Sequence, residues 1–192
     1  MDNILFIDAT VRSGSRTREL AEYLLQTLGE TVETLVLDDE KLSPLTARRL
    51  AWREECCRRG NFSDAYFDCA RQFAAADTIV IAAPFWDGSF PAVLKKYVET
   101  VCVQGITFRY TEAGEPQGLC RTKKLYYVTT SGGPIFSDVY GFGYIDSLAR
   151  TMFGIPETVC IKAEGLDLFG ADVSDIMKRA KKEIEALAED AQ

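Results

Sequence analysis

The chain has 192 residues, of which 47% are hydrophobic and 27% charged, values typical of a globular protein rather than a disordered or collagen-like one. This length is enough to bury roughly 70% of the surface that the unfolded chain exposes. The 22 Lys and Arg against 29 Asp and Glu give a net charge of −7, which disfavours nucleic acid as a partner because phosphodiester backbones are also negative. The chain has no histidine, which excludes Ser-His-Asp and Cys-His catalysis and histidine-ligated metals, and we expect no metal site.

The N-terminal residues carry neither a basic segment nor a long apolar run, so we expect no signal peptide and a cytoplasmic protein. The longest nearly apolar stretch, residues 79–86, is far shorter than the roughly 20 residues that a membrane-spanning helix needs, so we expect no membrane partner. Six cysteines without a C-x-x-C spacing give no support to a zinc or iron–sulfur site. We expect reduced thiols, with Cys56-Cys57 as the one suggestive pair.

Hydrophobic periodicity predicts strands that alternate with helices along the whole chain. In chain order we expect a strand at residues 4–7, a helix ended by Gly29, strands at 34–37 and 79–83, a helix at 92–102, a strand at 125–129, a helix at 145–153, a strand at 158–161 and a helix at 173–188. Apolar strands separated by helices favour an α/β fold, with a doubly wound parallel sheet covered on both faces. Because the chain shows no linker and no repeat, we expect residues 1–192 to form a single domain.

Two segments are longer than this alternation requires. Residues 40–76 carry two amphipathic helical patterns, interrupted near Gly60-Asn61. Residues 104–121 are polar and aromatic, and we interpret them as a hairpin-like excursion with its turn at Ala113-Gly114. Additions of this kind usually shape a site or an interface rather than the core.

Three loops follow the carboxyl ends of predicted strands, where ligands bind in open α/β sheets. Residues 10–17 combine Ser, Thr and Arg side chains with a helix start, which suits a phosphate group, although the loop lacks the P-loop and G-x-G-x-x-G patterns. Residues 84–90 contain aromatic side chains on which a planar ligand could stack. Residues 130–136 contain two adjacent glycines, whose amides can approach a ligand closely. Together the three loops predict a site for FMN.

Each loop also has a purely structural interpretation. Ser15 or Thr17 could act only as the N-cap of the following helix. The aromatic residues could simply close the end of the sheet, and the two glycines could form a plain turn. Only the combination of the three loops at one edge favours a flavin site.

The sequence resembles the family of FMN-dependent NADH:quinone oxidoreductases and azoreductases. The most specific match is the segment GITFRYTE at residues 105–112, followed by Gly118-Leu119 and Lys123-Lys124. Residues 84–88, residues 94–97 and Ser131-Gly132-Gly133 stand at the corresponding family positions, and the likeness weakens across residues 40–76. The resemblance implies a flavodoxin-like fold with five parallel strands in the order 2-1-3-4-5, and a homodimer with two sites at its interface.

The resemblance implies a role for each loop in binding FMN. It places four residues around the phosphate and the ribityl chain, namely Thr10, Ser15, Arg16 and Thr17. Five residues would flank the isoalloxazine ring, largely through backbone groups, namely Pro84, Phe85, Trp86, Asp87 and Gly88. Four residues would face the pyrimidine edge of the ring, namely Thr130, Ser131, Gly132 and Gly133. Tyr110 is a candidate to line the pocket.

This sequence departs from the common family pattern at three places. The phosphate loop is about one residue shorter, Asp87 stands where Asn is frequent, and Ser131 stands where Arg is frequent. If its side chain points inward, the Asp87 carboxylate would disfavour negative charge on the flavin. We therefore expect these departures to affect flavin potential and substrate preference more than FMN binding.

The implied activity is that of an NAD(P)H-dependent oxidoreductase, which passes a hydride through FMN to quinones or azo compounds by a ping-pong mechanism in one slot. The amides of Gly132 and Gly133 would meet the negative charge that develops on the ring. No side-chain acid or base is obligatory, and Tyr110, Tyr140 and Tyr144 are candidate proton donors. The sequence does not choose between NADH and NADPH.

Two other functions remain open at this point. A flavodoxin-type electron carrier agrees with the acidic composition, because such carriers dock basic partners. The two extra segments argue against it, since a minimal carrier does not need them. The other alternative is a flavin-binding or nucleotide-binding sensor whose activity is incidental.

Overall fold

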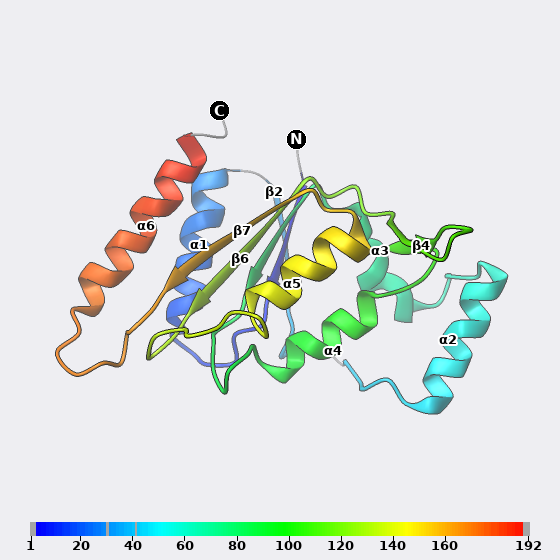
Figure 1. The fold of residues 1–192 in the computed structure, drawn as a ribbon, viewed down its shortest axis with the longest axis horizontal. Helices are drawn as coiled ribbons and strands as arrows, with labels where there is room; N and C mark the ends of the chain where they lie inside the picture. Colours follow the sequence, from blue (N-terminus) through cyan, green and yellow to red (C-terminus); the bar gives the residue numbers. More distant parts are fainter. Residues whose placement is uncertain (1–2, 30, 41, 190–192) are drawn as a thin grey trace.

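The structure, a computed structural model, describes residues 3–29, 31–40 and 42–189. Its strands and helices alternate along the chain as Figure 1 shows. The strands of the main sheet are β1 (Asn3–Asp8), β2 (Thr31–Val36), β3 (Thr78–Ala82), β6 (Lys124–Thr130) and β7 (Glu157–Ala163). The helices are α1 (Arg16–Leu28), α2 (Ala47–Arg59), the short 3₁₀ turn η1 (Ala65–Phe67), α3 (Asp68–Ala75), α4 (Ala92–Val101), α5 (Phe142–Leu148) with its π-helical continuation η2 (Ala149–Phe153), and α6 (Val173–Glu189).

The five strands pair in the order β2-β1-β3-β6-β7, and every pair is parallel. Counting only these strands, the order is 2-1-3-4-5, so the predicted flavodoxin-like, doubly wound sheet is confirmed. The order reverses direction after β1, because the chain first adds β2 on one side and then β3 on the other. Ligands in open α/β sheets bind at such a switch point, beyond the carboxyl ends of the strands.

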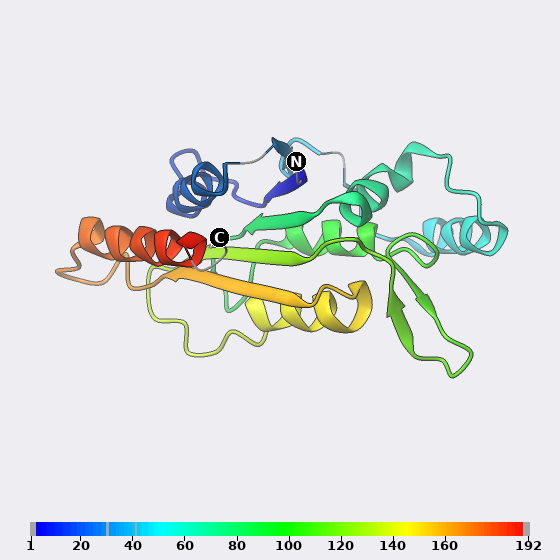
Figure 2. The ribbon, with the colours of Figure 1, turned by 90° about the horizontal axis from the view of Figure 1, so that it is seen from above.

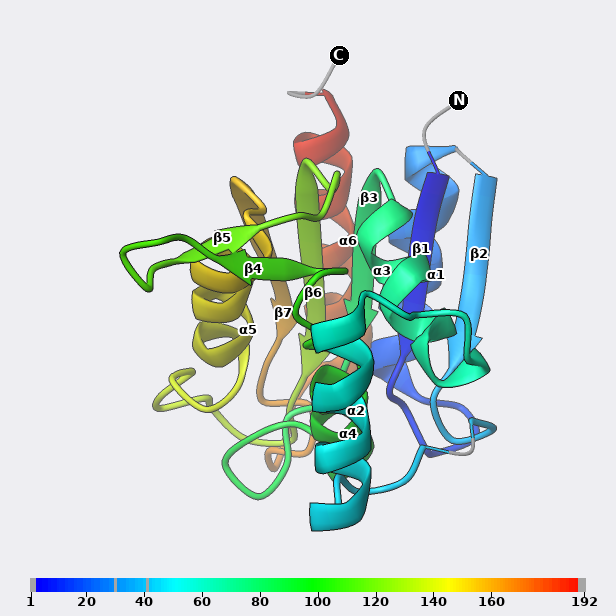
Figure 3. The same ribbon diagram turned by 90° about the vertical axis from the view of Figure 1, so that its right-hand side faces the viewer.

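Two hydrophobic cores lie on opposite faces of the sheet. In Figure 3, α3, α4 and α5 cover the near face while α1 and α6 lie behind the sheet. Successive side chains of a strand point to opposite faces, so Leu5 and Ile7 belong to the first core while Ile4 and Phe6 belong to the second. Burial on both faces explains why the central strands are continuous apolar runs.

The edge strand β2 begins three residues before the predicted position at residue 34. Residues 31, 33 and 34 are exposed, since an edge strand has a neighbour on only one side. Polar residues at its start gave no hydrophobic signal, which explains the difference in its boundary. At the other strands the predicted and observed boundaries agree within two residues.

The segment 40–76 forms two helices, as its two amphipathic patterns predict. Gly60 ends α2 in the left-handed conformation, with φ of 62°, which is the common conformation for a residue that terminates a helix. No residue of α2 is fully buried, and Figure 1 shows this helix apart from the sheet. Its contacts with the rest of the protein include Trp52, whose ring lies 5.2 Å from the ring of Tyr66 and 5.5 Å from that of Phe67, and Arg53, which donates to the carbonyl of Glu99 at 2.8 Å.

The segment 104–121 contains an antiparallel pair, β4 (Phe108–Tyr110) and β5 (Pro116–Gly118). Figure 2 shows this hairpin projecting away from the main sheet. Its base is held by the buried Thr107, whose hydroxyl donates a hydrogen bond to the carbonyl of Val101 at 2.7 Å. That residues 1–192 form a single domain stays a prediction. Within the described residues, no helix is long and apolar enough to cross a membrane.

Gly118 lets the hairpin pack against the end of η2. A Cβ atom built at Gly118 would lie 2.2 Å from backbone atoms of Phe153 and Gly154, and backbone cannot move aside as a flexible side chain can. We expect Gly118→Ala to destabilise the protein by about 1–3 kcal/mol, the usual cost of overpacking. Urea denaturation of the variant measures this loss.

Gln117→Ala is the matched control, because Gln117 neighbours Gly118 on β5 and is exposed. It removes only the exposed hydrogen bond from Arg109 and should change stability by no more than about 0.5 kcal/mol. Equal stability of the two variants would contradict the close approach of β5 to η2.

Candidate functional site

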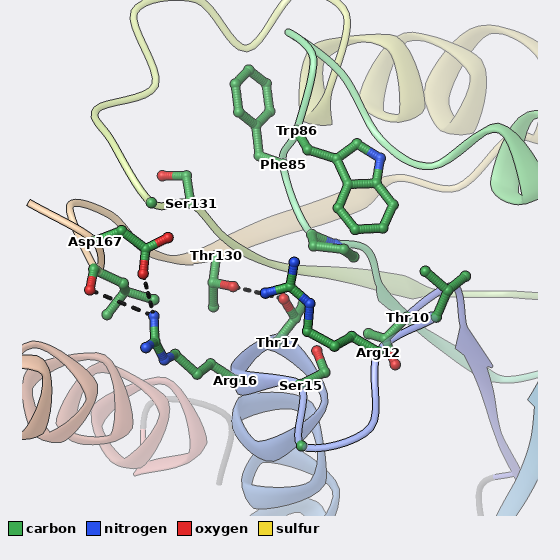
Figure 4. A pocket seen from close by; sticks show the side chains of 15 residues that line it. Thr10, Arg12, Ser15, Arg16, Thr17, Phe85, Trp86, Thr130, Ser131 and Asp167 are labelled. Atoms are coloured by element: carbon green, nitrogen blue, oxygen red, sulfur yellow. Dashed lines mark hydrogen bonds and ion pairs between the residues drawn. The ribbon is translucent and has the colours of Figure 1, made fainter.

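A cavity of about 280 Å³ lies at the carboxyl edge of the sheet, around the ends of β1, β3 and β6. Figure 4 shows the side chains that line it. All three predicted loops contribute to it, with Thr10, Ser15, Arg16, Thr17, Pro84, Phe85, Trp86, Thr130, Ser131 and Gly132. The fold therefore brings together most of the residues that the sequence singled out for one site.

Several predicted residues do not line this cavity. Asp87 and Gly88 come after the lining residue Trp86, and Gly133 comes after the lining residue Gly132, but all three lie outside the cavity wall. Tyr110 lies on β4 and is 51% exposed, and it does not line the cavity. The cavity is lined by neither Tyr140 nor Tyr144, so none of the three candidate tyrosines stands at the cavity of the single chain.

The first loop ends in the N-terminus of α1. Ser15 is the N-cap, and its hydroxyl accepts a hydrogen bond from the amide of Arg18 at 3.3 Å. The amides of Arg16 and Thr17 precede the first intrahelical hydrogen bond and have no acceptor within the helix. Capping and anion binding are thus compatible here, because Ser15 caps the helix while the next two amides and the positive end of the helix dipole stay available to a ligand.

Two buried hydroxyls join α1 to β6 at the floor of the cavity. The Oγ1 atoms of Thr17 and Thr130 lie 2.7 Å apart, and the side chains are 1% and 7% exposed. The pair carries two hydroxyl hydrogens, of which one lies between the two oxygens. The other remains free to be donated to a ligand, so the pair can serve as a hydrogen-bond donor in the cavity.

The charged groups of the cavity come from two sides of it. Arg12 and Arg16 belong to the first loop, and Asp167 belongs to the segment that follows β7. Arg16 Nη1 lies 2.9 Å from Asp167 Oδ1, and the amide of Asp167 donates to the carbonyl of Gly132 at 2.9 Å. Asp167 therefore links the first loop to the third.

Part of the lining was not predicted from the sequence, namely Val11, Arg12, Gly14, Leu166 and Asp167. The first three belong to a loop that was identified, and the last two follow the fifth strand. Since all five strands are parallel, the loop after the fifth strand leaves from the same edge as the others. That rule could have pointed to Leu166 and Asp167.

The second loop contains a tight turn between Trp86 and Ser89. Each of these residues donates a backbone hydrogen bond to the other, at 3.0 and 2.9 Å. Asp87 and Gly88 occupy the two central positions with φ of 52° and 78°, which describes the type I′ turn that favours Asn-Gly and Asp-Gly. Asp and Asn both tolerate this conformation, which gives a backbone reason for either residue at this position. The Asp87 side chain is exposed, and the residue is not part of the cavity wall.

The third loop is tied to the end of β7 by Glu164. The amide of Ile135 donates to Glu164 Oε2 at 3.1 Å, and Lys162 Nζ lies 2.7 Å from Oε1. Burial raises the pKa of Glu164, but the hydrogen bonds from Lys162 and Ile135 outweigh it, so the pKa lies below its usual value. Glu164 is therefore ionised at neutral pH and fixes the position of the loop that carries Gly132 and Gly133.

The turn conformation predicts that its two central residues differ in how well they tolerate substitution. Gly88→Ala should destabilise the protein by about 1–2 kcal/mol, because a Cβ atom is disfavoured in the left-handed region. Asp87→Asn should change stability by less than about 0.5 kcal/mol, since Asn adopts that region readily. Thermal unfolding of both variants tests this, and a loss in Asp87→Asn as large as that in Gly88→Ala would show that the Asp87 carboxylate itself stabilises the loop.

Comparisons with known proteins agree with this architecture. The family described as "Flavodoxin-like fold" matches residues 2–188. An FMN-dependent NADH:quinone oxidoreductase 2 of Clostridium acetobutylicum is 38% identical, over 93% of this chain and 94% of that protein. An FMN-dependent NADH:quinone oxidoreductase of Clostridium perfringens is 32% identical, over 98% of both chains.

Solved structures give the same result. An azoreductase from Bacillus anthracis superposes with a TM-score of 0.85 at 25% identity, over 98% of this chain and 99% of that one. An FMN-dependent NADH-azoreductase from the same species, solved in complex with FMN, has a TM-score of 0.81 at 23% identity, over 100% of this chain and 99% of that one, and supports the fold. The chain belongs to the flavodoxin-like family of FMN-dependent NADH:quinone oxidoreductases and azoreductases.

Proposed function

We propose that this protein binds FMN in the cavity at the carboxyl edge of the sheet and uses it to pass a hydride from NADH to quinones or azo compounds. The observation that carries the proposal is the meeting of the α1 N-terminus with the Thr17–Thr130 hydroxyl pair and the aromatic loop around one cavity. The relatives named above are FMN-dependent NADH:quinone oxidoreductases, which supports NADH as the donor.

The residues of the cavity fit the chemical groups of FMN. A phosphate dianion needs hydrogen-bond donors and positive charge, which the amides at the start of α1 and the guanidinium groups of Arg12 and Arg16 supply. A planar ring needs an apolar surface, which Phe85 and Trp86 can offer. Ribityl hydroxyls need partners that both donate and accept, such as Ser15 and the Thr17–Thr130 pair.

When bound, FMN accepts a hydride from NADH and passes the electron pair to an acceptor. The chain contributes positioning and electrostatics. Among the described residues, none accepts a hydrogen bond from the amide of Gly132 or Gly133, so both amides can donate to a ligand. The amide of Gly132 in the cavity wall, with that of Gly133 next to it in the chain, would offset negative charge on a bound flavin, as the donors of an oxyanion hole do. Phe85 and Trp86 would offer the ring an apolar surface.

The size of the cavity favours a site that a second subunit completes. A volume of about 280 Å³ is near the lower end of the roughly 300–1,000 Å³ that small-molecule pockets have, so the ring would extend beyond it. A homodimer with two sites at its interface would cover the exposed part, and Tyr110 of the hairpin is our candidate to line the completed site. We further propose that donor and acceptor use one slot in turn, in a ping-pong mechanism, and that the protein works in the cytoplasm.

The spectrum of the purified protein tests FMN binding directly. We expect flavin absorption bands in the protein as isolated, or after FMN is added and the excess removed. Under anaerobic conditions NADH should bleach these bands, and a quinone should restore them. A protein that shows no flavin bands even after FMN is added would contradict the proposed function.

Steady-state kinetics then separate the enzyme from the alternatives. A shared slot predicts parallel lines in double-reciprocal plots for NADH and quinone, and intersecting lines would contradict it. An electron carrier would oxidise NADH only with a separate reductase, and a sensor would turn over slowly with every quinone.

Thr17→Glu places a carboxylate beside the α1 amides to which the phosphate is proposed to bind. Two like charges about 4 Å apart interact by about 4 kcal/mol at an effective dielectric of about 20, so we expect FMN affinity to fall at least about 100-fold. Ser13→Glu adds the same charge to the same loop at a residue that does not line the cavity, and should weaken binding far less. Titration of flavin fluorescence measures both variants, and retained affinity in Thr17→Glu would show that the phosphate binds elsewhere.

A further inference from the structure

The carboxylate of Asp8 lies directly beneath the first loop of the cavity. Asp8 is the last residue of β1 and is fully buried. Its carbonyl accepts a hydrogen bond from the amide of Leu37 at 2.9 Å, which holds its backbone within the sheet. Its Oδ1 atom accepts two hydrogen bonds from Thr10, one from the amide at 2.8 Å and one from the hydroxyl at 2.6 Å.

This geometry limits what Thr10 can do in the cavity. A threonine has one amide hydrogen and one hydroxyl hydrogen to donate, and both are directed toward Asp8 Oδ1. Thr10 lines the cavity, yet it has no hydrogen left for a phosphate oxygen. Thr10 therefore acts as a support that Asp8 holds in place, and the first loop begins from a fixed position.

The second oxygen of Asp8 determines the charge behind the loop. Asp8 Oδ2 lies 3.2 Å from Arg18 Nη1, an ion pair without hydrogen-bond geometry. Arg18 is 43% exposed at its side chain and is shared with Glu22, whose Oε1 lies 3.0 Å from Arg18 Nε. One half-exposed cation thus faces two carboxylates, so the buried negative charge of Asp8 is only partly balanced.

We propose that Asp8 is a positioning residue with two opposed effects on the binding of a phosphorylated flavin. Its Oδ1 atom orders the first loop through Thr10 and so favours binding. Its negative charge lies behind the phosphate cradle and lowers the affinity for the dianion. Asp8 therefore sets how strongly the site prefers FMN to riboflavin, which lacks the phosphate, and this role rests on the proposed binding of FMN in this cavity.

Two substitutions separate these effects. Asp8→Asn keeps an oxygen acceptor for Thr10 and removes the charge, whereas Asp8→Leu is similar in size and removes both. In Asp8→Asn we expect the Kd for FMN to fall about three- to tenfold as the repulsion is removed, while the Kd for riboflavin changes by less than about twofold. In Asp8→Leu we expect the Kd for FMN to rise about tenfold or more relative to Asp8→Asn, because Thr10 loses its acceptor. Fluorescence titrations with both flavins give these values.

A double-mutant cycle tests whether Thr10 acts through Asp8. Thr10→Val removes the hydroxyl donor and keeps the shape of the side chain. It should weaken FMN binding in the wild type and in Asp8→Asn, and should have no further effect in Asp8→Leu. A further loss in Asp8→Leu would mean that the Thr10 hydroxyl bonds the phosphate directly, and would overturn the proposal.

The ratio of the two affinities distinguishes this role from a merely structural one. A general loss of stability would weaken FMN and riboflavin together, and thermal unfolding reports it separately. If Asp8→Leu does not fold, Asp8→Asn and Thr10→Val still test the proposal. Unchanged affinities for FMN and riboflavin in Asp8→Asn would overturn the role of the Asp8 charge. A wild-type protein that binds no FMN overturns the proposed function itself, whereas one that binds FMN with the same preference in every variant overturns only the role of Asp8.

Discussion

Backbone pairing that continues past the ends of the strands is the constraint on which the site depends. The amides that extend this parallel ladder belong to Ala9, Ala83, Phe85 and Ser131, which donate to the carbonyls of Ala82, Val128, Thr130 and Ala163 at 2.9 to 3.0 Å. Each loop therefore leaves the sheet from a fixed point beside its neighbour. Loops that are more than 100 residues apart in the sequence meet as a result, and the contact between Thr17 and Thr130 is one such meeting.

The sequence predicts the fold well because burial determines most of its elements. Strands covered on both faces must be apolar along their whole length, as residues 79–82 are in β3, so a continuous run marks them. The strand order came from the resemblance to a family, because periodicity says which segments are strands and not which of them pair. Prediction was weakest at the edge, where the start of β2 is exposed and polar.

The site could be predicted only as far as its loops. Position after a strand was sufficient to bring Thr10, Thr17 and Thr130 together, because the sheet places such residues at one edge. The role proposed for Asp8 could not be predicted, since it depends on which way a buried side chain turns and on Arg18, whose side chain reaches back from the first turn of α1. Asp167 was missed for a similar reason, because only the folded chain shows it beside Arg16.

The electrostatic environment of this site is determined by nearby charged groups, and the net charge of the whole chain does not reveal it. At physiological ionic strength exposed charges are screened beyond about 8 Å, so a phosphate bound as proposed would meet Arg12 and Arg16 rather than the net charge of −7. Arg16 is already paired with Asp167, and pairing holds its guanidinium in place before a ligand arrives, which reduces the entropy lost on binding. The same pairing would make a bound phosphate share Arg16 with the carboxylate of Asp167. Asp8 and Arg18 form a second ion pair behind the first loop, but there the cation is shared with Glu22. This deeper pair therefore adds a preformed geometry while part of the negative charge of Asp8 stays unbalanced.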